Sequence, residues 1–231
     1  MTAHTLDAAP STREVEASYD GSRPLRLAAA LALVSGPLLW AAGMFTSPET
    51  ATLSDTDYIS SLARDFTMTE ISALFLHYGN LFLGLGILAA PSLVRGRRGR
   101  RLVLWGSMLA ALGFTNMSGM ILADWWNASL GTLLPIDQAA EVFAMVKSSP
   151  LLPVWNGTEL FCLLGPLLLL AGLARAGVLG WYTIALMVGG TVGLVFIPGT
   201  LMSVAALAVL VGFSPFALVG LRLLQRLRVE A

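Results

Sequence analysis

Six long apolar stretches constrain this chain more than any other feature of its sequence, because each is long enough to cross a lipid bilayer as a helix. They lie at residues 26–46, 71–94, 102–123, 152–174, 178–197 and 200–223. Hydrophobic residues make up 56% of the chain and charged residues 12%, which is about half the charged share of a soluble domain. The sequence therefore predicts an all-α fold, a polytopic membrane helix bundle with six transmembrane helices.

The basic residues predict how this bundle is oriented in the membrane. Of the 14 lysines and arginines, all except Arg64 and Lys147 fall on one side when the six spans are threaded in turn. Positively charged connections stay in the cytoplasm, so we expect both termini there. The predicted organisation is a disordered cytoplasmic tail over 1–24, a six-helix transmembrane domain over 25–224 and a cytoplasmic tail over 225–231.

Two connections on the opposite side are long enough to hold short amphipathic helices. In the first, Ser54 precedes apolar residues at helical spacing. In the second, Pro135 opens a similar pattern that ends near Pro150. Both outer helices would lie across the mouth of the bundle or in the headgroup layer.

The spacing of these outer helices also suggests a duplication. Asp57, in the first helix, precedes Arg95 by 38 residues, and Asp137, in the second, precedes Arg175 by 38. We interpret the first four spans as two copies of one unit, which consists of a span, an outer helix and a return span. Spans five and six would form a third hairpin without the outer helix.

Polar side chains inside the predicted spans are the candidates for chemistry. His77, Asn116 and Glu159 belong to three different spans, and each lies six or seven residues from the outer end of its helix. That places them about 10 Å below the outer rim. A polar group facing lipid is costly, so groups at matching depth predict a cavity that opens outward.

Each of these residues has a functional and a structural interpretation. The catalytic candidates are Glu159, as a general acid or base, and His77, as its partner; alternatively, both serve helix packing. The candidates for ligand binding are Asn80, Asn116, Asp124, Trp155 and Asn156. Their structural alternatives are hydrogen bonds between helices for the asparagines, hydration for Asp124 and interfacial anchoring for Trp155.

Several classes of function lack their sequence signature. The chain has no HExxH, no glycine-rich phosphate loop and no nucleophile elbow. Its single cysteine, Cys162, cannot form a disulfide within the chain or a thiolate metal site. His77, Glu159 and Asp124 could in principle hold a metal, but their spacing matches no recognised ligand pattern, and we expect no metal and no cofactor. The expected partners are membrane lipids, an apolar or small-molecule ligand and a membrane-protein subunit. The basic side suits anionic lipid headgroups, which explains it without nucleic acid.

Three short motifs accompany the spans rich in Ala, Gly and Leu: HYGN at 77–80, RGRRGRR at 95–101 and DWWN at 124–127. With these features the chain resembles small, uncharacterised multi-spanning membrane proteins of high-GC bacteria over most of its length beyond residue 25. The resemblance implies a multi-pass protein of the bacterial plasma membrane. It carries no known activity and so implies no catalytic residue.

Three functions remain open from the sequence. The leading interpretation is a non-catalytic membrane protein whose outward cavity binds a small or lipid-like ligand or seats a partner subunit. The second is an intramembrane enzyme in which Glu159 and His77 act on an apolar, isoprenoid-like substrate. The third is a small transporter, although the almost wholly apolar inner halves of the spans argue against a complete path in one subunit.

Overall fold

The computed structural model describes residues 22–52 and 54–230, and the regular structure within these ranges is helical throughout. The elements are α1 (Ser22–Thr46), α2 (Asp55–Arg64), α3 (Phe66–Ile87), the 3₁₀ helix η1 (Ala90–Leu93), α4 (Arg100–Met120), α5 (Leu122–Leu133), α6 (Ile136–Lys147), α7 (Leu152–Asn156), α8 (Glu159–Arg175), α9 (Tyr182–Phe196) and α10 (Met202–Val229). The predicted tail over 1–24 lies outside the described residues as far as residue 21. Residues 225–229, expected in a C-terminal tail, continue α10.

Five helical segments of the described chain are long and apolar enough to cross a membrane. They are Ser22–Thr46, Phe66–Ile87, Arg100–Leu133, Leu152–Arg175 and Met202–Val229. The remaining predicted span, 178–197, contains α9, whose 15 residues extend about 22 Å and fall short of a hydrocarbon core of about 30 Å. Gly180 precedes this helix and Pro198 follows it, and both residues favour turns over helix.

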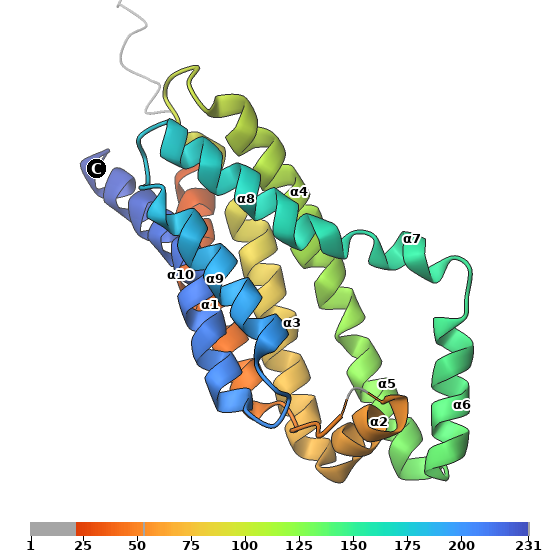
Figure 1. Ribbon diagram of the computed structural model, residues 1–231. Coiled ribbons are helices and arrows are strands. Elements are labelled where there is room, and N and C mark those ends of the chain that lie inside the picture. Colours follow the sequence, from red (N-terminus) through yellow and green to blue (C-terminus); the bar gives the residue numbers. More distant parts are fainter. Residues whose placement is uncertain (1–21, 53, 231) are drawn as a thin grey trace, which may run out of the picture.

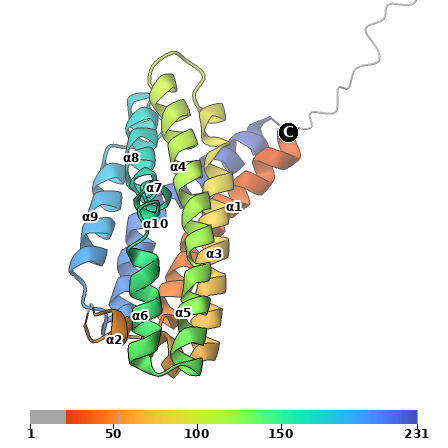
Figure 2. The same ribbon diagram turned by 90° about the vertical axis from the view of Figure 1, so that its right-hand side faces the viewer.

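The long helices form a ring in the order in which they occur in the chain. α1 packs on α3, α3 on α4, α4 on α8 and α9 on α10, and α10 closes the ring on α1 (Figures 1 and 2). The contact between α8 and α9 is the smallest in the ring. α1 packs as extensively on α10 as on α3, and both contacts exceed that between α9 and α10. The duplication of the first four spans stays a prediction.

Aromatic side chains fill the middle of this ring. Phe114 of α4 meets Phe213 and Phe216 of α10 at centroid distances of 5.9 and 5.7 Å, and Trp40 of α1 meets Phe213 at 5.3 Å. All three pairs are edge-to-face, an arrangement that adds about 0.5–1.5 kcal/mol per pair to the burial of apolar area. The centre of the bundle is therefore a packed apolar core.

Glycines seven residues apart bring α4 and α8 into backbone contact. Gly106 and Gly113 of α4 face α8, and Gly165 and Gly172 of α8 face α4. A methyl group built on Gly165 would lie 2.2 Å from the backbone nitrogen of Ala110, a distance that no side chain tolerates. Small residues allow this close approach of helices in lipid, and the seven-residue interval keeps them on one face.

A second layer, which we call the cap, consists of α2, α5 and α6 and lies at the end opposite the arginine-rich connection (Figures 1 and 2). α2 packs against both α5 and α6. The cap has a small core, which contains the buried residues Ile59, Leu62, Ala128 and Ala139. The helices predicted after Ser54 and at Pro135 are confirmed as α2 and α6, and the Ser54 side chain accepts a hydrogen bond from the Asp57 N–H.

α5 is the part of the cap that the apolar pattern did not predict. The third span was expected to end at residue 123, but the helix bends at Ile121 and continues to Leu133. No proline interrupts the chain between this bend and Pro135, so the helix persists through the polar DWWN motif. The span and α5 together form one helical segment of 34 residues.

Candidate functional site

A pocket of about 280 Å³ lies where α3 passes the bend between α4 and α5. Its polar lining comes from His77 of α3, Ser118 of α4 and Trp125 of α5. Its apolar lining includes Leu74 and Leu122, which are 43% and 53% exposed. The pocket therefore opens on the lateral surface of the bundle, and its polar groups lie among apolar side chains.

The His77 ring is fixed by its contacts with α4. The Ser118 hydroxyl oxygen lies 2.8 Å from His77 Nδ1, and the Ser118 carbonyl oxygen lies 3.2 Å from the same nitrogen. Nδ1 has a partner in either tautomer of the imidazole. Without a proton it accepts from the Ser118 hydroxyl, and with a proton it donates to the Ser118 carbonyl. The Tyr78 ring packs edge-on against the imidazole at 5.0 Å. Because Nδ1 is engaged with α4, Nε2 is the ring nitrogen that a bound molecule would meet.

Trp125 contributes a hydrogen-bond donor without an acceptor. Its indole Nε1 is buried and has no hydrogen-bond partner among the described residues. An unsatisfied buried donor costs about 1–3 kcal/mol. Trp125 lines the pocket, and a molecule whose acceptor oxygen reached this donor would remove the cost.

Asp124, a predicted ligand-binding residue, faces the cap instead of the pocket. The Tyr58 hydroxyl of α2 donates a hydrogen bond to Asp124 Oδ1. The Tyr58 ring also packs on Phe143 of α6 at 5.6 Å, and Lys147 of α6 pairs with Asp55 of α2 at 2.8 Å. Asp124 thus joins α5 to α2, and residues of α2 make the contacts with α6.

Burial raises the pKa of the Tyr58 phenol well above its usual range, and the nearby Asp124 carboxylate raises it further. The folded state therefore favours the neutral phenol. Its contribution to stability is present below the unfolded pKa of about 10 and is lost as the pH rises through the folded pKa. We expect phenolate absorbance from Tyr58 to be absent in the folded protein at pH values where free tyrosine ionises. Alkaline titrations of the wild type and Tyr58→Phe that differ by one phenolate near pH 10 would contradict this.

A second group of predicted residues lies on the other side of α4. The Asn116 Nδ2 donates to the Trp155 carbonyl at 3.3 Å, and Trp155 belongs to the short helix α7. Asn156 follows it with a buried Oδ1 that has no partner in the described chain. Glu159 is exposed in the first turn of α8. This group gathers where the fourth predicted span breaks between α7 and α8.

The structure does not bring Glu159 and His77 together. Asn116 and Ser118 are two positions apart on α4, which places their side chains about 200° apart around the helix. His77 contacts the Ser118 side, whereas Glu159 starts the helix whose preceding turn contacts Asn116. No interaction of the described residues joins the two predicted catalytic candidates.

Asn80, the remaining predicted ligand-binding residue, lies inside the bundle. It is completely buried, and its Nδ2 donates to the Leu76 carbonyl of its own helix at 2.9 Å. Its Oδ1 is buried without a hydrogen-bond partner among the described residues. Asn80 therefore belongs to the interior of α3 and does not line the pocket beside His77.

Sequence reasoning missed Ser118 and the roles of Tyr58 and Trp125. Helical spacing places Tyr58 among the apolar residues that follow Ser54, and the DWWN motif gives no sign that Trp125 lines a pocket. The signal that could have found Ser118 is its position on α4, seven residues after Ala111, which lies against Gly84 of α3. No group of three or more metal-ligating side chains occurs within residues 22–52 and 54–230. No protein-family model, curated protein or solved structure matches the chain.

Proposed function

We propose that this chain is a multi-pass plasma-membrane protein that binds a small, largely apolar molecule in the pocket between α3 and the α4–α5 bend. α9 would complete six spans as a short helix, and the arginine-rich end would face the cytoplasm with both termini. The pocket then lies toward the outer side. The observation that carries the proposal is the buried, unpartnered indole N–H of Trp125 beside the fixed imidazole of His77.

The lining defines the chemical class of the ligand. A volume of about 280 Å³ is at the lower end for sites that hold small molecules, so the ligand is compact or inserts only one end. An acceptor oxygen would pair with Trp125 Nε1, and a hydroxyl would reach His77 Nε2. The exposed side chains of Leu74 and Leu122 surround the opening, which favours entry from the hydrocarbon of the bilayer.

Binding accounts for this geometry better than acid–base chemistry does. The one carboxyl group close to the pocket in sequence, Asp124, accepts a hydrogen bond from Tyr58 of the cap. Glu159 lies with Asn116 and Trp155 on the other side of α4. The pocket itself combines a neutral donor, an imidazole and apolar walls, which are the means of holding and orienting a ligand.

Gly119→Trp is expected to abolish ligand binding, because Gly119 lines the pocket and a Cβ added there meets no atom within 4 Å. The indole would extend from this open position into the space of the ligand. Native mass spectrometry of gently extracted protein should show a bound small molecule on the wild type and none on this variant.

Gly189→Trp is the matched control, because Gly189 on α9 also has open space around an added side chain and lies away from the pocket. It should retain the bound molecule. His77→Leu should weaken binding about tenfold by removing one hydrogen bond. Equal occupancy in wild type and Gly119→Trp would show that the ligand does not use this pocket.

A further inference from the structure

A larger cavity lies at the arginine-rich end of the bundle, on the outward surface of the α1–α3 pair. It is an open groove of about 840 Å³. Small residues, Ala29, Ala32 and Gly86, form its more buried part. Leu31 and Leu85 stand beside them and are 54% and 60% exposed. The groove is therefore apolar, with small residues at its base and leucines along its sides.

The length of the groove matches one leaflet of a bilayer. Along α1 its lining runs from Ser22 to Ser35; the part from Arg26 to Ser35 rises about 13 Å, and half of a hydrocarbon core is about 15 Å. The Ser35 hydroxyl donates to the Leu31 carbonyl at 2.8 Å, so its polarity is satisfied within the helix. The groove thus presents hydrocarbon along its length and a guanidinium at its membrane-surface end.

The charge around this end is strongly positive. Among the described residues it carries eleven arginines, namely Arg23, Arg26, Arg95, Arg97, Arg98, Arg100, Arg101, Arg175, Arg222, Arg226 and Arg228. Glu230 is the one acidic residue that the described chain places there. A second groove on the other side of α1 is lined by Arg23 and Arg228. An anionic headgroup complements this surface, and a headgroup without net charge does not.

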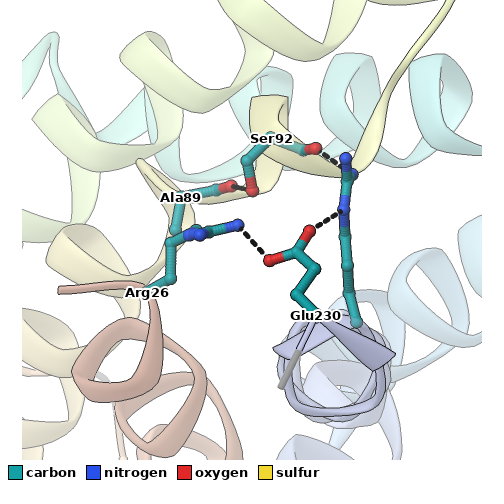
Figure 3. Close-up of polar contacts among 5 residues, drawn as sticks. Arg26, Ala89, Ser92 and Glu230 are labelled. Atoms are coloured by element: carbon teal, nitrogen blue, oxygen red, sulfur yellow. Dashed lines mark hydrogen bonds and ion pairs between the residues drawn. The ribbon is translucent and has the colours of Figure 1, made fainter. Parts of the chain in front are cut away.

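Arg26 is held at the end of the groove by an ion-pair network (Figure 3). Glu230 accepts hydrogen bonds from Arg26 Nη1 at 2.9 Å and from Arg226 Nε at 3.1 Å. Arg226 also donates to the carbonyl of Ser92, which ties α10 to η1. The hydrogen bond from Arg226, with the nearby Arg26, holds the pKa of Glu230 below its usual range. A carboxylate between two guanidinium groups occupies a position that a phosphate group fits equally well.

We propose that the α1–α3 groove holds an acyl chain of an anionic phospholipid and that Arg26 binds its phosphate in competition with Glu230. The groove supplies affinity for the chain, and the arginine favours a phosphate that no cation of the same headgroup neutralises. This site is at the opposite end of the bundle from the pocket beside His77, so it stands independently of the function proposed above.

The test is lipid retention by the full chain in nanodiscs that contain equal parts of phosphatidylglycerol and phosphatidylcholine, measured by native mass spectrometry after extraction. The wild type is expected to retain phosphatidylglycerol preferentially. Arg26→Gln should lower this preference about tenfold. Arg175→Gln removes an arginine of the same end away from the groove and should leave it unchanged. Ala28→Trp, at an exposed position of the groove, should displace both lipids, whereas Ala185→Trp on α9 should not.

Glu230→Gln separates lipid binding from a purely structural ion pair. It removes the competing carboxylate and keeps Arg26, so retention of phosphatidylglycerol should rise. A fall as large as that of Arg26→Gln would overturn the proposal, as would equal losses in Arg26→Gln and Arg175→Gln. Arg26→Gln alone could be unstable because it leaves Glu230 without one of its partners. The double variant Arg26→Gln/Glu230→Gln removes this acid as well and should still lose the preference for phosphatidylglycerol.

Discussion

Gly165→Ala is expected to lower the free energy of unfolding by about 3 kcal/mol, the upper end of the cost of overpacking. The added methyl group would lie 2.2 Å from the backbone nitrogen of Ala110, and backbone cannot rotate aside as a side chain can. Relief requires α4 and α8 to separate along the most extensive helix contact of the bundle. Equilibrium unfolding in detergent micelles would measure the loss.

Gly189→Ala is the control for this substitution, because the same methyl group on α9 meets nothing within 4 Å. Its free energy of unfolding should change by no more than about 1 kcal/mol, in the stabilising direction, from the better helix propensity of alanine. Similar stabilities for the two variants would show that α4 and α8 are not in backbone contact. A large loss in both would indicate a general intolerance of the spans to added volume.

The second large effect is expected at the junction of the cap. Tyr58→Phe should destabilise the protein by about 2 kcal/mol, because it removes a hydrogen bond to Asp124 and leaves a partly buried acid without its donor. The cap should loosen first, since α2 meets the rest of the protein mainly through α5 and α6. Hydrogen exchange of the amides in α2 and the free energy of unfolding would both report it.

A double-mutant cycle isolates this contact. Asp124→Leu removes the acid, and the double variant Tyr58→Phe/Asp124→Leu should be less destabilised than the sum of the single variants, by about 1 kcal/mol or more. Tyr78→Phe, at a residue that is 49% exposed, should change stability by less than about 0.5 kcal/mol. Strict additivity of the two single variants would mean that the hydroxyl and the carboxyl do not interact.

The helical character of the fold was predictable from the sequence because length, apolarity and helix caps are local properties. Ser54 and Pro135 marked the starts of α2 and α6 correctly. The boundaries were less predictable, because apolarity does not reveal where a helix stops. The DWWN motif looked like the end of a span, but a helix continues through polar residues when no breaker follows. The predicted fifth span contains a helix of only 15 residues for the opposite reason, since turn-forming residues flank it.

The candidate site depends on how each helix is rotated about its axis, which the depth of polar residues does not specify. Depth alone grouped His77 with residues that lie on the far side of α4. The rotation of α4 follows from its small residues, since Gly113 faces α8 and Ala111 lies against Gly84 of α3. Ser118, seven positions after Ala111, must then face α3 and His77. If the helix faces that carry small residues are assigned first, Ser118 is predicted as the partner of His77.

α5 extends beyond the bend at Ile121, so a small change of angle at the bend moves the far end of α5 by a larger distance. Twelve residues extend beyond it as α5, a rod of about 18 Å, so a change of about 10° at the bend moves the far tip by about 3 Å. Because Ile121 also lines the pocket, we expect a molecule bound there to restrict such a movement. Occupancy of the pocket would then alter the tilt of α2 and α6.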